Sequence, residues 1–392
     1  MIKKIFSMIL VCCLAVSLRV VPYADVYSLD AAKGAVLIDA ASGRVIEENN
    51  CRSRLPNAST TKIMTAILTL EQPDLDEMFT VDANAIAVEG SSMGLTEGDS
   101  VSLRTLAWGM LLSSGNDAAN AAAVRIDGSI EKFCERMNKK AAELGMQDTH
   151  FSSPSGLENG EHYTTAYDLA LLARYALQND DFAEMVSSKS AKLYYGNPPY
   201  HRWLTNHNRL LWQCEDCIGI KTGFTKAAGR CLVSAAERDG LTLIAVTLGC
   251  PDDFNTHHAV YDSCFERLEF VDFGDMASSL SVAVTGAEEG RIPIAPLWAP
   301  GAYLAADEAK QVELSFAVEP FIYAPVEEGK IVGSAVLKLD GATISQTPLV
   351  TSKSLPSRFP ERRSVIDRVK DFFAAPEQYR FPLNEREQLL LR

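Results

Sequence analysis

Segments with the character of β-strands stand at both ends of a long helical stretch, and this order constrains the fold more than any other feature. Ala35 to Ile38 and Arg44 to Ile46 are short apolar runs around a turn, which predicts an opening hairpin. Asp239-Gly240 predicts a second tight hairpin turn late in the chain. Strand character returns there in three segments, Ile218 to Thr222, Cys231 to Ala236 and Leu241 to Leu248.

Helical periodicity fills the stretch between these strands. Ile63, Met64, Ile67 and Leu68 recur at helical spacing after Thr60. The predicted helices are Thr60 to Leu70, Leu103 to Leu112, Ala118 to Ile126, Ile130 to Leu144 and Thr165 to Leu177. We therefore expect an α+β domain, in which the first and last strands meet in one antiparallel sheet flanked by helices, with a helical subdomain inserted.

The pattern changes after about Phe273. Alternating apolar and polar residues at Ser281 to Val284, Val312 to Val318 and Ile331 to Leu339 predict a small all-β domain without long helices. We place the first domain at residues 25–275, the β-domain at 276–354 and an amphipathic tail at 355–392. The apolar stripe of this tail makes it a candidate membrane anchor; its residues are Val365, Ile366, Val369, Phe372 and Phe373.

The amino-terminal residues have the pattern of a secretory signal peptide. Lys3 and Lys4 precede an apolar run from Ile5 to Leu18, which is short for a membrane span. Cleavage after Ser17 or after Ala24 fits the pattern, and we set the signal at residues 1–24. The expectation is an exported, extracytoplasmic protein that is secreted or attached peripherally to the membrane at the cell wall.

Charge and cysteine content narrow the functional classes further. A formal net charge of −14 disfavours binding to nucleic acid. Seven cysteines follow the signal, an odd number, so at least one thiol stays free or pairs between chains. Cys214 and Cys217 lack a second ligand pair for zinc, and we expect a loop disulfide or two structural thiols. His257 and His258 are expected at the surface, and no metal or cofactor is implied.

Ser59-Thr60-Thr61-Lys62 places a hydroxyl and an amine three residues apart on a predicted helix, so that the two side chains can touch. A serine hydroxyl becomes a good nucleophile when a neighbouring base takes its proton. An amine accepts that proton only when it is neutral, and free lysine titrates near ~10.4. Lys62 would therefore need a pKa lowered by burial or by a second cation.

The Ser-x-x-Lys pattern alone is not specific, because it also occurs at Ser129 to Lys132, which we expect to be an exposed first turn of a helix. Two further motifs support the pair Ser59 and Lys62. Only Ser59 to Lys62 is followed by Ser114-Gly115-Asn116, on a loop before a helix capped by Asp117, and by Lys221-Thr222-Gly223, at the end of a strand. In this order the three elements are the motif set of β-lactamases and penicillin-binding proteins.

The surrounding segments resemble the low-molecular-weight penicillin-binding proteins that act as D-alanyl-D-alanine carboxypeptidases. The resemblance covers about residues 30 to 350 and implies a β-lactamase/transpeptidase-like domain followed by the small β-domain. It rests on Pro56 to Thr65, Ser113 to Ala118 and Gly219 to Thr225, and on the connecting stretches Ser155-Gly156-Leu157, His162 to Asp168 and Asn206 to Leu211.

The resemblance also implies a role for each motif residue. Ser59 would attack the carbonyl of the penultimate D-alanine of a peptidoglycan stem peptide, and Lys62 would accept its proton. Ser114, Asn116 and Lys221 would relay a proton to the leaving amine. The remaining implied roles are carboxylate binding by Lys221 and Thr222, room for the substrate backbone at Gly223, and an oxyanion hole made by the backbone N–H groups of Ser59 and Phe224.

The resemblance implies β-lactams as covalent inhibitors and contact of the tail with the outer leaflet of the cytoplasmic membrane. Some relatives hold the substrate carboxylate with an arginine after the final core strand, but Pro251 to His258 contains none, so binding is expected to rest more on Lys221 and Thr222. The alternatives are a β-lactamase, whose glutamate-bearing loop has no convincing counterpart, and a β-lactam or peptidoglycan sensor without turnover. Gly90-Ser91-Ser92-Met93-Gly94 matches a nucleophile elbow but lacks the preceding strand.

Overall fold

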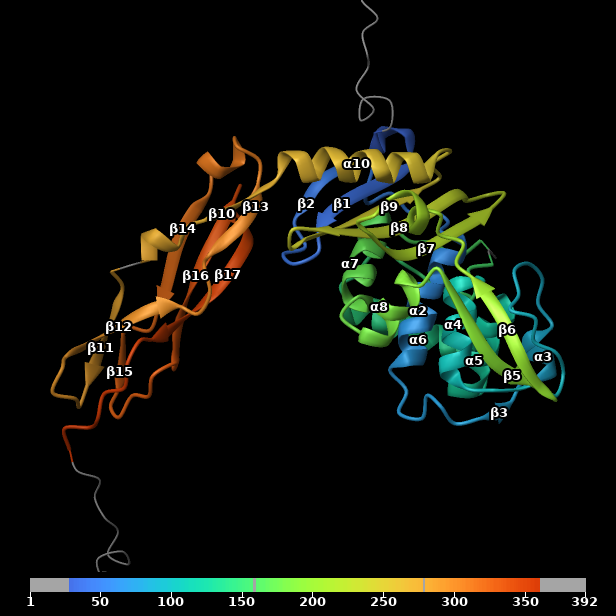
Figure 1. The fold of residues 1–392 in the computed structure, drawn as a ribbon, viewed down its shortest axis with the longest axis horizontal. Helices are drawn as coiled ribbons and strands as arrows, with labels where there is room; N and C mark the ends of the chain where they lie inside the picture. Colours follow the sequence, from blue (N-terminus) through green and yellow to red (C-terminus); the bar gives the residue numbers. More distant parts are fainter. Residues whose placement is uncertain (1–27, 158–159, 278, 360–392) are drawn as a thin grey trace, which may run out of the picture. The chain divides into compact units, whose positions relative to one another are not determined.

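The computed structural model describes residues 28–157, 160–277 and 279–359 (Figure 1). The predicted signal, residues 1–24, lies outside the described part, as does the predicted tail beyond residue 359. The described residues form two compact units, 28–269 with Tyr303–Asp307, and 270–302 with 308–359.

The sheet of the first unit is antiparallel, in the order β2-β1-β9-β8-β7. β1 pairs along its length with β9, so the first and last strands meet as predicted. Both faces of β1 are buried, because Ala35 and Leu37 pack in one apolar cluster and Val36 and Ile38 in another. The strands are β1 (Gly34–Asp39), β2 (Val45–Asn49), β7 (Cys217–Thr225), β8 (Gly229–Arg238) and β9 (Leu241–Leu248).

A helical subdomain covers one face of this sheet and α10 (Asp253–Arg267) covers the other (Figure 1). The predicted Thr60 to Leu70 helix is divided, with a 3-10 turn at Ala58–Thr61 preceding α2. α5 begins at Asn116, two residues before the predicted start at Ala118. The helices are α2 (Lys62–Leu70), α3 (Ala83–Ile86), α4 (Leu103–Leu112), α5 (Asn116–Asp127), α6 (Ile130–Glu143), α7 (Ala166–Ala176), α8 (Asp180–Ser187) and α9 (Leu210–Gln213).

The expectation that His257 is a surface residue is wrong. It lies on α10 with no exposed surface, and its ring hydrogen-bonds to Ser234 Oγ at 2.6 Å and to Thr247 Oγ1 at 2.9 Å. These two strand hydroxyls satisfy both ring nitrogens, which makes burial tolerable. Burial lowers the pKa of His257 to about 3, so the ring stays neutral. His258 is partly exposed and faces Asp262, as expected for a surface residue.

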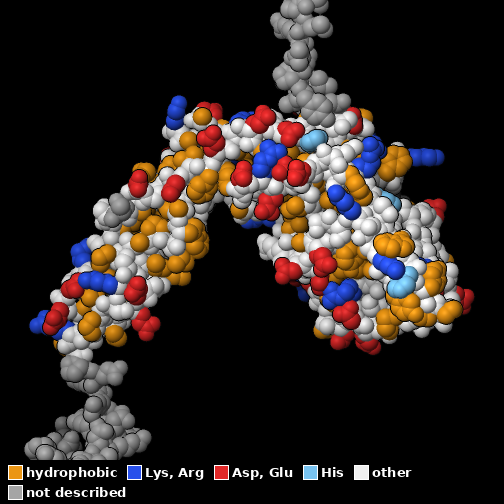
Figure 2. Space-filling model, viewed as in Figure 1, with side chains coloured by type: hydrophobic (Ala, Val, Ile, Leu, Met, Phe, Trp, Pro, Cys, Tyr) orange, Lys and Arg blue, Asp and Glu red, His pale blue; other side chains and the backbone are white. Residues whose placement is uncertain are grey.

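A hairpin that the sequence did not predict projects from the helical subdomain. β5 (Ser190–Gly196) pairs with β6 (Pro199–Thr205). Trp203 lies opposite Lys192 and His201 opposite Tyr194, so one face of the hairpin carries exposed aromatic rings. Figure 2 shows these hydrophobic and histidine side chains gathered over the hairpin. A short pair, β3 (Phe79–Thr80) and β4 (Ser100–Val101), lies in the same subdomain.

The second unit is the predicted all-β domain and has its own apolar core. Its sheet has the order β14-β16-β17-β12-β11-β15. A separate two-stranded sheet pairs β10 (Glu269–Asp272) with β13 (Gly301–Leu304). Val282, Ile294 and Leu349 are among its core side chains. The six strands are β11 (Ser281–Thr285), β12 (Arg291–Pro296), β14 (Glu313–Val318), β15 (Phe321–Tyr323), β16 (Ile331–Leu339) and β17 (Ala342–Thr351).

The seven cysteines among the described residues are all buried thiols. Cys214 and Cys217 are thus two structural thiols rather than a loop disulfide, and burial is the main cause of the raised pKa of each. In the same part of the chain, no helix combines the length and the apolar character that crossing a bilayer requires.

Candidate active site

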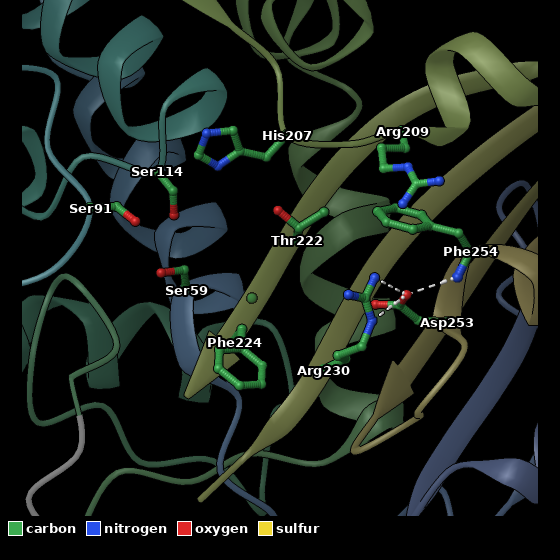
Figure 3. A pocket seen from close by; sticks show the side chains of 11 residues that line it. Ser59, Ser91, Ser114, His207, Arg209, Thr222, Phe224, Arg230, Asp253 and Phe254 are labelled. Atoms are coloured by element: carbon green, nitrogen blue, oxygen red, sulfur yellow. Dashed lines mark hydrogen bonds and ion pairs between the residues drawn. The ribbon is translucent and has the colours of Figure 1, made fainter. Parts of the chain in front are cut away.

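Three segments distant in sequence meet at one cavity of about 370 Å³ (Figure 3). Ser59 comes from the turn before α2, Ser114 from the loop between α4 and α5, and Thr222 from β7, which continues to Thr225 beyond the predicted strand end. The three predicted motifs are therefore brought together. The cavity is lined by Ser59, Ser91, Ser114, His207, Arg209, Thr222, Gly223, Phe224, Arg230, Asp253 and Phe254.

Ser59 and Lys62 are in direct contact. The Lys62 Nζ lies 2.9 Å from Ser59 Oγ and also donates to Asn116 Oδ1 at 2.7 Å and to the Ser155 carbonyl at 2.6 Å. The Asn116 amide is oriented by its own nitrogen, which donates to the Glu89 carbonyl. Two of the three partners can only accept, so a neutral Lys62 would give them its two N–H groups and turn its lone pair toward the Ser59 hydroxyl.

Burial favours the neutral form of Lys62. The side chain has no exposed surface, and its desolvation is the main reason why the pKa of Lys62 falls well below the ordinary lysine value. The positive charge of Lys221 lowers it further, whereas Asp117 opposes the shift. The Lys62 amine is therefore neutral, as proton abstraction requires, at a lower pH than the amine of free lysine.

Lys221 lies behind the cavity wall and contacts the second motif. Its Nζ donates to Ser114 Oγ at 3.1 Å and to the Thr222 carbonyl at 2.8 Å. Only 1% of its surface is exposed, and desolvation lowers the pKa of Lys221 to about 7. The Ser114 hydroxyl is thereby held at the end of a buried cation, in a position from which it can pass a proton.

Two glycines allow the backbone segments to approach this closely. A Cβ on Gly223 would lie 3.0 Å from the Ser59 nitrogen, so β7 runs directly beside the turn that carries Ser59. A Cβ on Gly156 would lie 1.9 Å from the Ala58 carbonyl, and the φ of Gly156 is +84°. This packing places the predicted oxyanion-hole amides of Ser59 and Phe224 on adjoining backbone segments.

Asp117 was predicted to cap a helix, but its carboxylate contacts another loop instead. α5 begins one residue before Asp117, and the carboxylate accepts from the backbone nitrogens of Met93 and Leu95, each at 3.0 Å. Ser92, the serine of the elbow-like motif, donates to the same carboxylate. This buried anchor fixes the loop that carries Ser91 into the cavity. A carboxylate that reaches another loop has no signature in local sequence.

Two guanidinium groups line the cavity, although the stretch after the final core strand, Pro251 to His258, contains no arginine. Arg230 is the second residue of β8 and binds Asp253 at 2.5 Å, and Arg209 precedes α9. Sequence reasoning missed both, because their approach depends on how β8, α9 and α10 pack. The second Ser-x-x-Lys pattern serves as a helix start, where Ser129 Oγ accepts from the Lys132 backbone. No cluster of metal-ligating side chains occurs among the described residues.

Comparisons with known proteins identify the family of this chain. Residues 24–252 match the family model described as D-alanyl-D-alanine carboxypeptidase, and residues 281–357 match the model of the penicillin-binding protein 5 C-terminal domain. The chain is 31% identical over 341 residues to the D-alanyl-D-alanine carboxypeptidase DacF of Bacillus subtilis, covering 83% of this chain and 86% of that protein.

Two further relatives extend the match over both units. DacC of Escherichia coli, another D-alanyl-D-alanine carboxypeptidase, is 32% identical and 87% of each chain is covered. The crystal structure of penicillin binding protein 5 from Haemophilus influenzae is similar with a TM-score of 0.67 and 25% identity, over 83% of this chain and 98% of that one. The motifs, the fold and these matches together show that the chain belongs to the D-alanyl-D-alanine carboxypeptidase family of serine peptidases.

Proposed function

We propose that this protein removes the terminal D-alanine from peptidoglycan stem peptides through an acyl-enzyme on Ser59. The contact between Ser59 Oγ and the buried Lys62 amine carries the proposal. In the first step the Ser59 oxygen bonds to the carbonyl carbon of the penultimate D-alanine while its proton passes to Lys62. The backbone N–H groups of Ser59 and Phe224 stabilise the oxyanion.

Collapse of this intermediate breaks the peptide bond and expels D-alanine as an amine. Ser114 gives its hydroxyl proton to the leaving nitrogen and takes a replacement from the protonated Lys221, to which it is hydrogen-bonded. Asn116 accepts a hydrogen bond from the Lys62 amine and so fixes its position, and Gly223 leaves space for the substrate backbone along β7. Thr222, which lines the cavity, binds the terminal carboxylate together with the buried Lys221 behind it. Water then attacks the ester carbonyl, one of its protons passes through Ser114 to Lys221, and Lys62 returns its proton to the Ser59 oxygen as the acid product leaves. A β-lactam would instead leave a slowly hydrolysed acyl group.

Replacement of the nucleophile tests the proposal. We expect Ser59→Ala to abolish both D-alanine release from a peptide ending in D-Ala-D-Ala and covalent labelling by benzylpenicillin, measured by intact-protein mass spectrometry. Ser129→Ala, in the second Ser-x-x-Lys pattern, should retain both activities because Ser129 caps α6. Labelling of the Ser59→Ala protein would exclude Ser59 as the nucleophile. Rapid steady hydrolysis of nitrocefin without D-alanine release would instead identify a β-lactamase.

We also propose that the protein is exported and contacts the membrane through its carboxy-terminal segment. The support is the apolar stripe of the predicted tail, which lies outside the described residues. A chain truncated at Ser357 should lose the membrane-bound fraction on cell fractionation and keep its penicillin labelling. An unchanged membrane-bound fraction would contradict the anchoring role of the tail.

A further inference from the structure

The terminal carboxylate of the proposed substrate needs a positive charge that faces the cavity, and Lys221 is poorly placed to supply it alone. Its ammonium is buried and already donates to Ser114 and to the Thr222 carbonyl. Because its pKa is lowered to about 7, the Lys221 side chain is only partly protonated near neutral pH. The Thr222 hydroxyl contributes a hydrogen bond but no charge.

Arg230 stands where such a charge is needed. It pairs directly with Phe224 across the β7–β8 ladder, which makes it the diagonal neighbour of Thr222 on the same face of the sheet. Figure 3 shows its guanidinium between Asp253 and the strand that carries Thr222 and Phe224. Its side chain is 41% exposed, in contrast to the buried Lys221.

A buried carboxylate fixes the orientation of this guanidinium. Asp253 is only 3% exposed, and its Oδ1 accepts from Arg230 Nε at 2.9 Å and from Nη2 at 2.5 Å. Within the described residues, Nη1 of Arg230 makes no hydrogen bond to another protein group. The Arg230 guanidinium is therefore immobilised along its Nε and Nη2 edge, and Nη1 remains available to a ligand.

The cavity keeps an excess of positive charge despite Asp253. The Phe254 ring lies between two guanidiniums, 5.1 Å from that of Arg230 and 5.5 Å from that of Arg209. Both arginines line the cavity, and Asp253 is the one carboxylate among its described lining residues. An anion entering beside Thr222 thus meets two cations and one anion.

We propose that Arg230, held in place by Asp253, is the residue that binds the C-terminal carboxylate of the substrate and so makes the enzyme specific for a free carboxyl end. This inference rests on the proposed function. It assigns carboxylate recognition to a strand-borne arginine in addition to the Lys-Thr-Gly motif. The planar fork of arginine suits a carboxylate better than an ammonium does.

A matched pair of peptides tests the assignment. One is an N-acylated peptide ending in Lys-D-Ala-D-Ala, and the other is the same peptide with a C-terminal amide. For the wild-type protein we expect a higher kcat/KM with the acid. Arg230→Gln should lower kcat/KM for the acid by about 10- to 100-fold, mainly through KM, and leave the value for the amide almost unchanged. Arg230→Lys should recover part of the preference.

Arg238→Gln is the control, because Arg238 lies on the same strand and binds Asp216 in a similar way away from the cavity. It should keep the wild-type preference. Since Arg230→Gln leaves the buried Asp253 unpaired, the double variant Arg230→Gln/Asp253→Asn is measured as well, and the same loss of preference is expected.

Two outcomes would overturn the assignment. An unchanged acid-to-amide ratio in both Arg230→Gln and the double variant would exclude Arg230, and so would a loss of preference seen in Arg209→Gln alone. A wild-type protein that releases no D-alanine and is not labelled by penicillin would instead refute the proposed function, so the two failures are distinguishable.

Discussion

At the scale of single residues, the two buried lysines determine how the site responds to pH. Lys62 and Lys221 are both buried, and the positive charge of Lys221 disfavours protonation of Lys62. Only the neutral form of Lys62 can accept the Ser59 proton. The acylation rate should therefore rise with pH as Lys62 loses its proton, at a pH well below the ordinary pKa of lysine.

Removal of the Lys221 charge should shift this rise. In Lys221→Gln the protonated form of Lys62 loses a repulsive neighbour, so the pKa of Lys62 increases and the acidic limb moves to higher pH. The acidic limb stays below the pH at which free lysine titrates, because desolvation, the larger cause of the lowered pKa of Lys62, persists in the variant. The measurement is the second-order rate of acylation by benzylpenicillin between pH 4 and 10.

Lys226→Gln provides the control for this shift, because it removes the same charge from an exposed position on the turn after β7. Its acidic limb should coincide with that of the wild type. If Lys221→Gln and Lys226→Gln give the same limb, the charge of Lys221 does not act on Lys62.

The residues with chemical signatures were predictable, and those that act through backbone or distant packing were not. Ser59, Lys62, Ser114 and Lys221 stand in recognisable short motifs. The Ser155 carbonyl, which fixes the Lys62 amine, is a backbone group that any residue type would provide. The Arg230–Asp253 pair joins β8 to α10, so it depends on how these two elements pack and has no local sequence motif.

At the scale of elements, the turn that carries Ser59 depends on the loop packed against it. The Ser155-Gly156-Leu157 stretch supplies the carbonyl that binds Lys62 and the glycine that touches Ala58. This contact sets the position of the nucleophile relative to its base. A change at Gly156 should therefore affect both the stability of the fold and the rate of acylation.

Gly156→Ala combines two penalties, a side chain at positive φ and a Cβ 1.9 Å from the Ala58 carbonyl. Gly145→Ala carries only the first, because Gly145 has a φ of +78° and no atom within 4 Å of the added Cβ. We expect Gly145→Ala to lose about 1–2 kcal/mol of unfolding free energy and to acylate normally. Gly156→Ala should lose more and acylate more slowly, as measured by urea unfolding and penicillin labelling. Equal behaviour of the two variants would contradict the role of this contact.

Elements with strong hydrophobic periodicity were predictable, whereas elements without a clearly apolar face were missed. β9 and β16 have the predicted bounds, because buried strands with adjacent turn signals are distinctive. α10 was not predicted, since its buried face includes His257 and Cys264 beside aromatic residues. The β5–β6 hairpin was missed because its exposed rings obscure the alternation that marks a strand.

At the scale of the whole molecule, each unit has its own apolar core. The cavity with Ser59 belongs to the first unit, and the described part of the second unit contributes no residue to it. The fold class was predictable because the switch from helical to alternating periodicity is visible in the sequence. The return of Tyr303–Asp307 to the first unit was not, because a five-residue segment carries no periodic signal.

Separate cores predict separate responses to core mutations. Leu349 on β17 and Leu243 on β9 are both fully buried leucines, the first in the core of the second unit and the second in a core of the first. Replacement of either by alanine should remove about 2–5 kcal/mol from the stability of its own unit. Leu349→Ala should leave the rate of penicillin acylation unchanged, whereas Leu243→Ala should lower the fraction of protein that is acylated at elevated temperature.

Calorimetry with and without bound penicillin separates the two effects. The acyl group stabilises only the unit that holds it, so the transition that shifts on acylation belongs to the first unit. Leu349→Ala should lower the Tm of the other transition, and Leu243→Ala should lower the Tm of the penicillin-sensitive one. A single transition lowered equally by both variants would mean that the units unfold together, because the melting of either core would then expose the other.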